Sequence, residues 1–230
     1  MAKPTQNKLV QTLSDIHNHS CNINTREIFL HGFYGFGDED EHGIDYRQAT
    51  IFEKNLSLLD DTNLDILIHM HTIGGEWNDG MAIYDYISNA KSYITILGSS
   101  IVCSMSSIII QAADQRILMP NCEFMIHFGN ISEENTSLAH ISGAKMEEYR
   151  NNKMLRIYAE KCLKGIYFQS KKNYTVDKCV KFLGDKIKQN GDWWLTSDEA
   201  LYYGFVDGIF GTPRFLTIED IRAQAKKSCN

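Results

Sequence analysis

Apolar segments that alternate between strand-like and helix-like spacing occupy the middle of the chain, and this alternation restricts the fold more than any other feature. The strands expected are Leu64 to Met70, Tyr93 to Leu97 and two short ones around Ile117 and Phe124, and the helices between them are near Asp79 to Asn89 and Ser106 to Ala113. Strand, helix and strand in repetition imply right-handed crossovers and a mainly parallel sheet. The sequence therefore predicts an α/β fold.

The length suits one globular domain with a substantial core, because the chain has 230 residues, 43% of them hydrophobic, and only three prolines. We expect this domain to span residues 25–212. Residues 1–24 are polar and are expected to form an irregular N-terminal segment, and residues 213–230 a tail of uncertain order. A short strand is expected at Arg26 to Leu30, followed by an acidic, glycine-rich surface loop over residues 31–45.

Charge and cysteine content exclude several classes of protein. The net charge of −6 and scattered lysines and arginines argue against a nucleic-acid surface, which requires a basic patch. The six cysteines show no CxxC spacing, so we expect reduced thiols in a cytoplasmic compartment. The N-terminus has no apolar core and no run approaches the length of a membrane span, so neither a secretory signal nor a membrane association is expected.

Three residues at the ends of separate elements have the types of a hydrolytic triad: Ser104, His127 and Asp192. A serine hydroxyl is a poor nucleophile at neutral pH. It needs an imidazole to accept its proton and a carboxylate to hold that imidazole in one tautomer.

Backbone donors for an oxyanion are also expected. Gly74 and Gly75 follow the strand that ends at Met70, and glycine can turn its N–H groups toward a neighbouring site. Met105 follows Ser104 in the first turn of a helix, where N–H groups are unpaired and the helix dipole favours negative charge. Gly75 and Met105 are therefore the candidate oxyanion donors.

Each of these residues also has an ordinary structural interpretation. Ser104 alone would usually be a helix N-cap, His127 a core histidine and Asp192 a turn residue after Asn190 and Gly191. A double glycine after a strand is first of all a turn. The functional interpretation depends on all of them occurring together in this order. The pairs His17 with His19 and His69 with His71 lack a third ligand at suitable spacing, so no metal site is expected.

The order of these motifs resembles the ClpP family of self-compartmentalised serine peptidases. The shared pattern is the double glycine, a helix containing Met81-Ala82-Ile83-Tyr84-Asp85, Ser-Met at a strand-to-helix junction, Pro120-Asn121 before Met125-Ile126-His127, and Asp192 ahead of Glu199-Ala200 and Tyr203-Gly204. The resemblance extends from about Arg26 to about Gly211. It implies the α/β fold of the ClpP and crotonase-like proteins, with a curved, mainly parallel sheet, surrounding helices and a protruding handle helix.

The resemblance implies catalytic roles for Ser104, His127 and Asp192, oxyanion donation by Gly75 and Met105, and a substrate-binding edge at Gly74, Glu76, Trp77 and Phe128. The chain departs from the family pattern in three places: His71-Thr72-Ile73 before the glycines, Ser100-Ile101-Val102-Cys103 before the nucleophile, and Phe128-Gly129 after the histidine. These departures concern the peptide-binding edge more than acyl transfer, and they indicate a divergent member.

The resemblance also implies that the protein assembles into an oligomer. The pattern from Ala139 to Tyr167 is the longest helical one. Its apolar stripe (Met146, Tyr149, Met154, Leu155, Tyr158, Ala159 and Leu163) suits core packing or an oligomer contact better than a cofactor site, and we favour the oligomer contact. The family implies homo-oligomeric stacked rings, with unfolded polypeptides or peptides as substrates and an AAA+ unfoldase as partner. The chain itself has no GxxxxGK[ST] motif for ATP, and no cofactor is expected.

Two alternative functions are also compatible with the sequence. A catalytically impaired subunit that acts as a structural or binding scaffold would keep the fold without the activity. An acyl-CoA enzyme of the same superfamily would use similar oxyanion donors, but it would need no Ser-His-Asp triad.

Overall fold

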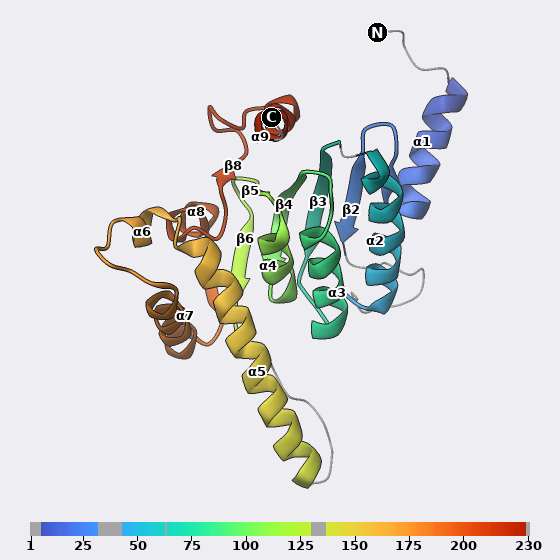
Figure 1. Ribbon diagram of the computed structural model, residues 1–230. Coiled ribbons are helices and arrows are strands. Elements are labelled where there is room, and N and C mark those ends of the chain that lie inside the picture. The colour runs from blue at the N-terminus through green and yellow to red at the C-terminus, as the bar shows by residue number, and fades with distance from the viewer. Residues whose placement is uncertain (1–5, 32–42, 63, 130–136, 229–230) are drawn as a thin grey trace.

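A computed structural model describes residues 6–31, 43–62, 64–129 and 137–228, and its centre is a twisted sheet (Figure 1). The strands are β1 (Cys21–Asn22), β2 (Glu27–His31), β3 (Ile66–Thr72), β4 (Ile94–Cys103), β5 (Gln115–Leu118), β6 (Glu123–Ile126), β7 (Trp193–Leu195) and β8 (Gly208–Ile209). Their order is β1-β2-β3-β4-β5-β8, and β6 pairs with the far end of β4 and with β7. All pairs are parallel except β1 with β2 and β6 with β7. The expected α/β fold with a mainly parallel sheet is confirmed.

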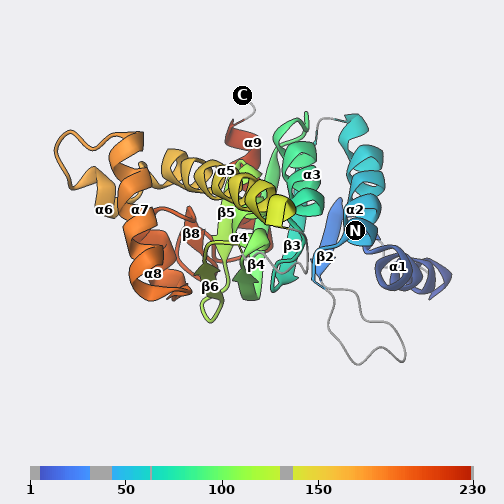
Figure 2. The ribbon, with the colours of Figure 1, turned by 90° about the horizontal axis from the view of Figure 1, so that it is seen from below.

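Helices connect and flank these strands. They are α1 (Gln6–His19), α2 (Tyr46–Leu59), α3 (Trp77–Ser88), α4 (Met105–Ile109), α5 (Ser137–Cys162), α6 (Ile166–Gln169), α7 (Val176–Asn190), α8 (Ser197–Tyr203) and α9 (Ile218–Ser228). Seen from below, α1 lies at one lateral end of the molecule, and α6, α7 and α8 lie at the other (Figure 2). No helix in the described ranges is both long and apolar enough to cross a membrane.

The two faces of the sheet are covered differently. Even-numbered strand residues such as Ile68 and Ile96 join the main core with Phe52, Ile83 and Tyr158 from the connecting helices. This alternation follows from the two-residue period of a strand. The main core therefore lies between the sheet and α2 to α5.

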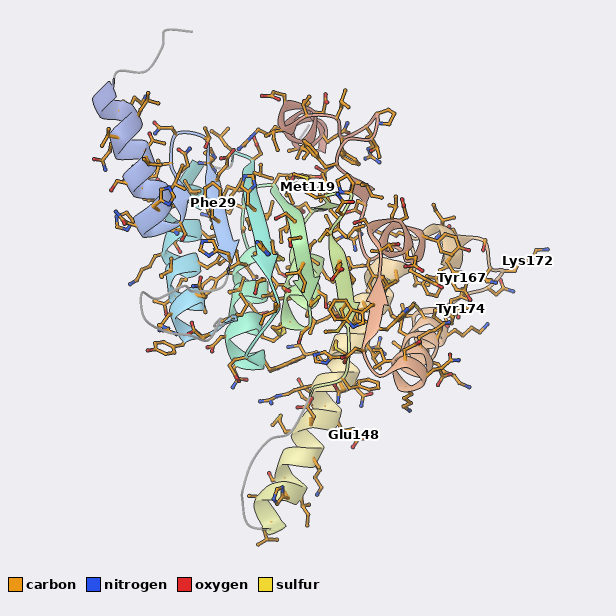
Figure 3. The ribbon with its side chains drawn as sticks, turned by 180° about the vertical axis from the view of Figure 1, so that it is seen from behind. Phe29, Met119, Glu148, Tyr167, Lys172 and Tyr174 are labelled. Atoms are coloured by element: carbon orange, nitrogen blue, oxygen red, sulfur yellow. The ribbon has the colours of Figure 1, made fainter. Side chains whose placement is uncertain are left out.

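The opposite face is covered at one end by α9, where Phe215 and Ile221 pack on Leu67, Leu97 and Ile117. Seen from behind in Figure 3, α9 lies at the end of the sheet away from the protruding part of α5. The expectation of a tail of uncertain order over residues 213–230 is wrong for α9. The apolar residues of this segment contact β3, β4 and β5 together, so the surface that they cover exists only after these three strands have paired.

The N-terminal segment also differs from expectation, because α1 and β1 are regular elements. Leu9, Leu13 and Ile16 recur at helical spacing, and β1 pairs with β2 through Cys21 and Ile28. A polar composition does not by itself indicate a segment without regular secondary structure, because a helix on the surface is polar over most of its circumference. Most of the expected acidic loop, residues 32–42, lies outside the described residues.

Helix α5 corresponds to the handle, and its lower half extends beyond the rest of the molecule (Figure 1). Its apolar stripe serves two purposes. Met154, Leu155, Tyr158 and Ala159 are buried in the core of the same chain, whereas Leu138, Ile141, Met146 and Tyr149 are exposed. The expectation that the whole stripe is an oligomer contact is therefore wrong for its C-terminal half.

Candidate active site

Ser104 lies in the sharp turn that joins β4 to α4. Its backbone has φ 53° and ψ −124°, a region that residues with a Cβ rarely adopt. The hydrogen bond from Ser104 N–H to the Met125 carbonyl (3.0 Å) extends the β4–β6 pairing to this residue. A strained strand-to-helix turn of this kind exposes a serine hydroxyl at the edge of a sheet.

Two serines after Ser104 stabilise the turn. Ser106 Oγ lies within hydrogen-bond distance of the Thr72 carbonyl (2.8 Å) and the Cys103 carbonyl (2.6 Å), so it links β3 to the turn. Ser107 Oγ donates to the Ser104 carbonyl (2.6 Å) and lies 2.7 Å from the buried Tyr158 hydroxyl. Sequence reasoning missed these supports, although the run Ser104-x-Ser106-Ser107 was their signal.

His127 reaches Ser104 because β6 pairs with β4 in parallel. Cys103 lies opposite Met125, so His127 follows the end of β6 beside the turn. The distance from His127 Nε2 to Ser104 Oγ is 2.7 Å. This hydrogen bond joins residues that are 23 positions apart in the chain.

Asp192 reaches the other ring nitrogen through the antiparallel pairing of β6 with β7. Trp193 lies opposite Ile126, which brings the preceding Asp192 next to His127. The distance from His127 Nδ1 to Asp192 Oδ1 is 3.3 Å, and the side chains are 23% and 58% exposed, respectively. The structure thus brings together Ser104, His127 and Asp192 in the order of contact that the sequence predicts.

Gly74 and Gly75 approach the turn so closely that neither position has space for a side chain. Gly74 has φ 99°, and a Cβ there would lie 2.6 to 2.7 Å from Cys103 O, Met105 N and Ser104 Cβ. Gly75 has φ 152° and forms a bridge with Ile44, whose backbone atoms a Cβ would overlap. The double glycine is therefore a close backbone contact as well as a turn.

The N–H groups of Gly75 and Met105 lie beside Ser104. The bridge uses the hydrogen bonds from Ile44 N–H to Gly74 O (2.6 Å) and from Glu76 N–H to Ile44 O (2.8 Å), so it leaves Gly75 N–H unused. Met105 is the first residue of α4, where an N–H has no partner within the helix. Both residues line the same cavity as Ser104.

This cavity has a volume of about 210 Å³. It is lined by Gly75, Glu76, Trp77, Ser104, Met105, Ile108, His127, Gly129, Glu147, Arg150, Asn151 and Met154. Glu76 and Trp77 thus line the same cavity as Ser104 and His127, and their role in binding substrate stays a prediction. Gly74 packs behind the turn, and Phe128 lines a neighbouring cavity between α5 and α7. Sequence reasoning missed Ile108 and the four lining residues of α5.

Cys103 directly precedes Ser104 but does not resemble a competing nucleophile. The side chain is buried, and desolvation raises the pKa of its thiol to about 12, with the charge of Glu123 adding to the effect. A thiolate, not a thiol, is the reactive form of cysteine. Cys103 therefore packs as a small apolar residue.

Comparison with known proteins identifies the family. The family model described as Clp protease matches residues 41–213. This chain belongs to the Clp protease family. The match excludes α1, β1, β2 and α9, and it includes every residue of the triad.

The Clp protease relatives are distant in sequence. The ATP-dependent Clp protease proteolytic subunit 2 of Tropheryma whipplei (strain Twist) is 30% identical over 152 residues, which cover 65% of this chain and 76% of that protein. The ATP-dependent Clp protease proteolytic subunit of Streptococcus equi subsp. equi (strain 4047) is 25% identical over 156 residues, which cover 65% of this chain and 70% of that protein. The resemblance to the ClpP family is confirmed, and the chain is a divergent member with the fold of a Clp-type peptidase.

Proposed function

We propose that this Clp-type peptidase is a serine endopeptidase that hydrolyses unfolded polypeptides and peptides through an acyl-enzyme. The observation that carries the proposal is the chain of contacts from Ser104 Oγ to His127 Nε2 (2.7 Å) and from His127 Nδ1 to Asp192 Oδ1 (3.3 Å). In this mechanism Nδ1 of His127 carries its proton toward Asp192, and Nε2 accepts the hydrogen bond from Ser104.

The first half of the reaction follows from this geometry. Ser104 Oγ attacks the carbonyl carbon of the substrate while His127 Nε2 accepts the hydroxyl proton. The carbonyl oxygen acquires negative charge, and the N–H groups of Gly75 and Met105 stabilise it as preorganised donors. When the carbon–nitrogen bond breaks, the protonated His127 gives its proton to the leaving amine, and the acyl group stays on Ser104.

Water completes the cycle. His127 accepts a proton from a water molecule as it attacks the acyl carbon, and it returns the proton to Ser104 as the ester bond breaks. Asp192 orients the imidazole of His127 and stabilises the imidazolium. All of these groups belong to the chain, so the mechanism uses no cofactor.

Assembly and partners follow from the family. The relatives are named as proteolytic subunits of an ATP-dependent protease, and this chain has no ATP-binding motif of the GxxxxGK[ST] type. We therefore propose homo-oligomeric stacked rings in the cytoplasm that receive unfolded substrates from an AAA+ unfoldase. The exposed apolar residues of the lower half of α5 (Leu138, Ile141, Met146 and Tyr149) are the surface that supports this proposal. Sedimentation should report a multi-subunit oligomer, and a clean monomer at micromolar concentration would contradict it.

Labelling with a fluorophosphonate tests the activity. Ser104 should react covalently in the assembled protein, and Ser104→Ala should abolish labelling. His127→Ala should lower peptide turnover by about three orders of magnitude or more, because the general base is lost. Labelling that persists in Ser104→Ala would move the nucleophile to another residue. An intact, assembled protein that is not labelled would instead be a catalytically impaired scaffold.

A further inference from the structure

The cavity beside Ser104 contains an ion pair that the proposed mechanism does not use. Glu147 and Arg150 are three residues apart on α5, and both line the cavity. Arg150 Nη1 lies 3.7 Å from Glu147 Oε2, and the two side chains are 30% and 14% exposed, respectively. A half-buried charge pair beside a nucleophile needs an explanation, because desolvation makes such pairs costly.

The carboxylate of Glu147 lies against Gly129, two residues after His127. A Cβ on Gly129 would overlap Glu147 Oε1, so the glycine leaves the space that the carboxylate occupies. The backbone N–H of Gly129 donates to Asn151 Oδ1 (3.2 Å) on the next turn of α5. The wall of the cavity formed by α5 is therefore fixed relative to His127.

The position of the cavity determines which part of a substrate enters it. The cavity is lined by the nucleophile Ser104 and by both oxyanion donors, Gly75 and Met105. The side chain nearest to an attacked carbonyl is that of the residue that contributes this carbonyl, called P1. The volume of about 210 Å³ is below that of pockets for drug-sized ligands, so it suits a single side chain.

We infer that Glu147 and Arg150 make this cavity a P1 pocket for a neutral side chain with a carboxamide, best fitted by glutamine. This inference rests on the proposed function and names its substrate class. An arginine donates hydrogen bonds and accepts none, whereas an ionised carboxylate only accepts. A carboxamide offers a carbonyl to Arg150 and an NH2 group to Glu147, so both charges keep a partner when water leaves.

Other P1 side chains leave one or both charges without a partner. A leucine would desolvate the pair without a new hydrogen bond, and a polar site discriminates strongly against such an analogue. An acidic side chain would meet two carboxylates, Glu147 and Glu76. A basic one would approach the same two carboxylates, but it would displace Arg150 from its ion pair with Glu147 and leave the guanidinium without that partner. The apolar side chains of Met105, Ile108 and Met154 line the same cavity and suit the methylene stem of glutamine.

The test uses the assembled full chain and fluorogenic peptides that are identical except for glutamine, leucine, glutamate or lysine at P1. The wild-type kcat/KM should be at least about tenfold higher for glutamine than for each of the others. Arg150→Leu leaves an unpaired carboxylate and should shift the preference to lysine by at least about tenfold. Glu147→Leu leaves an unpaired guanidinium and should shift it to glutamate by a similar factor.

The controls are Glu148→Leu and Arg156→Leu, which change the same charges on the same helix outside this cavity. Glu148, labelled in Figure 3, lines the neighbouring cavity, and Arg156 pairs with Asp177 on the surface. Both controls should keep the wild-type P1 profile. The double variant Glu147→Leu/Arg150→Leu lacks both members of the ion pair and should lose the preference for glutamine over leucine.

Fluorophosphonate labelling separates the possible failures, because the probe carries no P1 side chain. If all variants are labelled at the wild-type rate and leucine is preferred throughout, the P1 assignment is overturned while the proposed function stands. If the assembled wild type is not labelled, the proposed function is overturned and the P1 assignment with it.

Discussion

Gly74→Ala should inactivate the protein by displacing the turn that holds Ser104. The substitution meets two obstacles. At φ 99° a residue with a Cβ is strained, at a cost of about 1–2 kcal/mol. The new Cβ would also lie 2.6 to 2.7 Å from Cys103 O, Met105 N and Ser104 Cβ, which belong to or adjoin the backbone of the turn. Relief of that overlap adds about 1–3 kcal/mol, so the free energy of unfolding should fall by about 2–5 kcal/mol.

The effect on chemistry should exceed the effect on folding. Movement of the turn changes the contact of 2.7 Å between Ser104 Oγ and His127 Nε2 and displaces Met105 N–H from the oxyanion position. A displacement of about 1 Å at a reacting group lowers the rate about 100-fold. The assay is the rate of fluorophosphonate labelling, measured at a temperature where denaturant titration shows the variant to be folded.

A matched variant isolates the backbone strain. Gly211 has φ 86°, lies outside the site, and has no atom within 4 Å of a Cβ placed there. Gly211→Ala should therefore lose about 1–2 kcal/mol and keep the wild-type labelling rate. If Gly74→Ala loses no more stability than Gly211→Ala and is labelled at the wild-type rate, the close contact between the glycine and the nucleophile turn has no functional role.

Two further predictions concern stability. Tyr158→Phe should cost about 1–2 kcal/mol in urea unfolding, because it removes one of the two hydrogen-bond partners of the buried Ser107 hydroxyl and leaves only the Ser104 carbonyl. Tyr149→Phe, on the exposed part of the same helix, should change the free energy of unfolding by less than about 0.5 kcal/mol. The His69 imidazole, whose Nε2 lies 3.9 Å from Glu27 Oε2, and then the hydrogen bond from Arg222 lower the pKa of Glu27 from 4.5. Because the folded-state pKa is the lower one, the stabilisation is complete above pH 4.5 and is lost as the pH falls through the lowered value. Glu27→Gln should flatten this part of the curve of unfolding free energy against pH, and a curve as steep as that of the wild type would contradict the assignment.

The sequence by itself determined the α/β class and the identities of the candidate triad. Both could be predicted because they depend on local information. The apolar periodicity of β3, α3 and β4 is fixed within each segment, and the types and order of Ser104, His127 and Asp192 are visible without a structure. The strand-to-helix junction at Ser104 came from the family resemblance, since the strand pattern expected there ended at Leu97, whereas β4 runs to Cys103.

Contacts between distant segments could be decided only by the tertiary structure. The distances within the triad depend on the register of β6 against β4 and of β7 against β6, which no local pattern specifies. Helix α9 was mistaken for a tail because the face that it covers exists only after β3, β4 and β5 pair.

The lining of the cavity beside Ser104 also could not be predicted from the sequence. The apolar stripe of α5 is exposed at Tyr149 and buried at Met154 and Tyr158, so one helical pattern changes its environment along its length. Which turn of that helix faces Ser104 depends on how α5 packs against α4 and α7, and so the sequence did not reveal that Glu147 and Arg150 lie in the cavity beside Ser104. A periodic pattern specifies that a helix has an apolar face, but the packing of the whole chain decides what that face contacts.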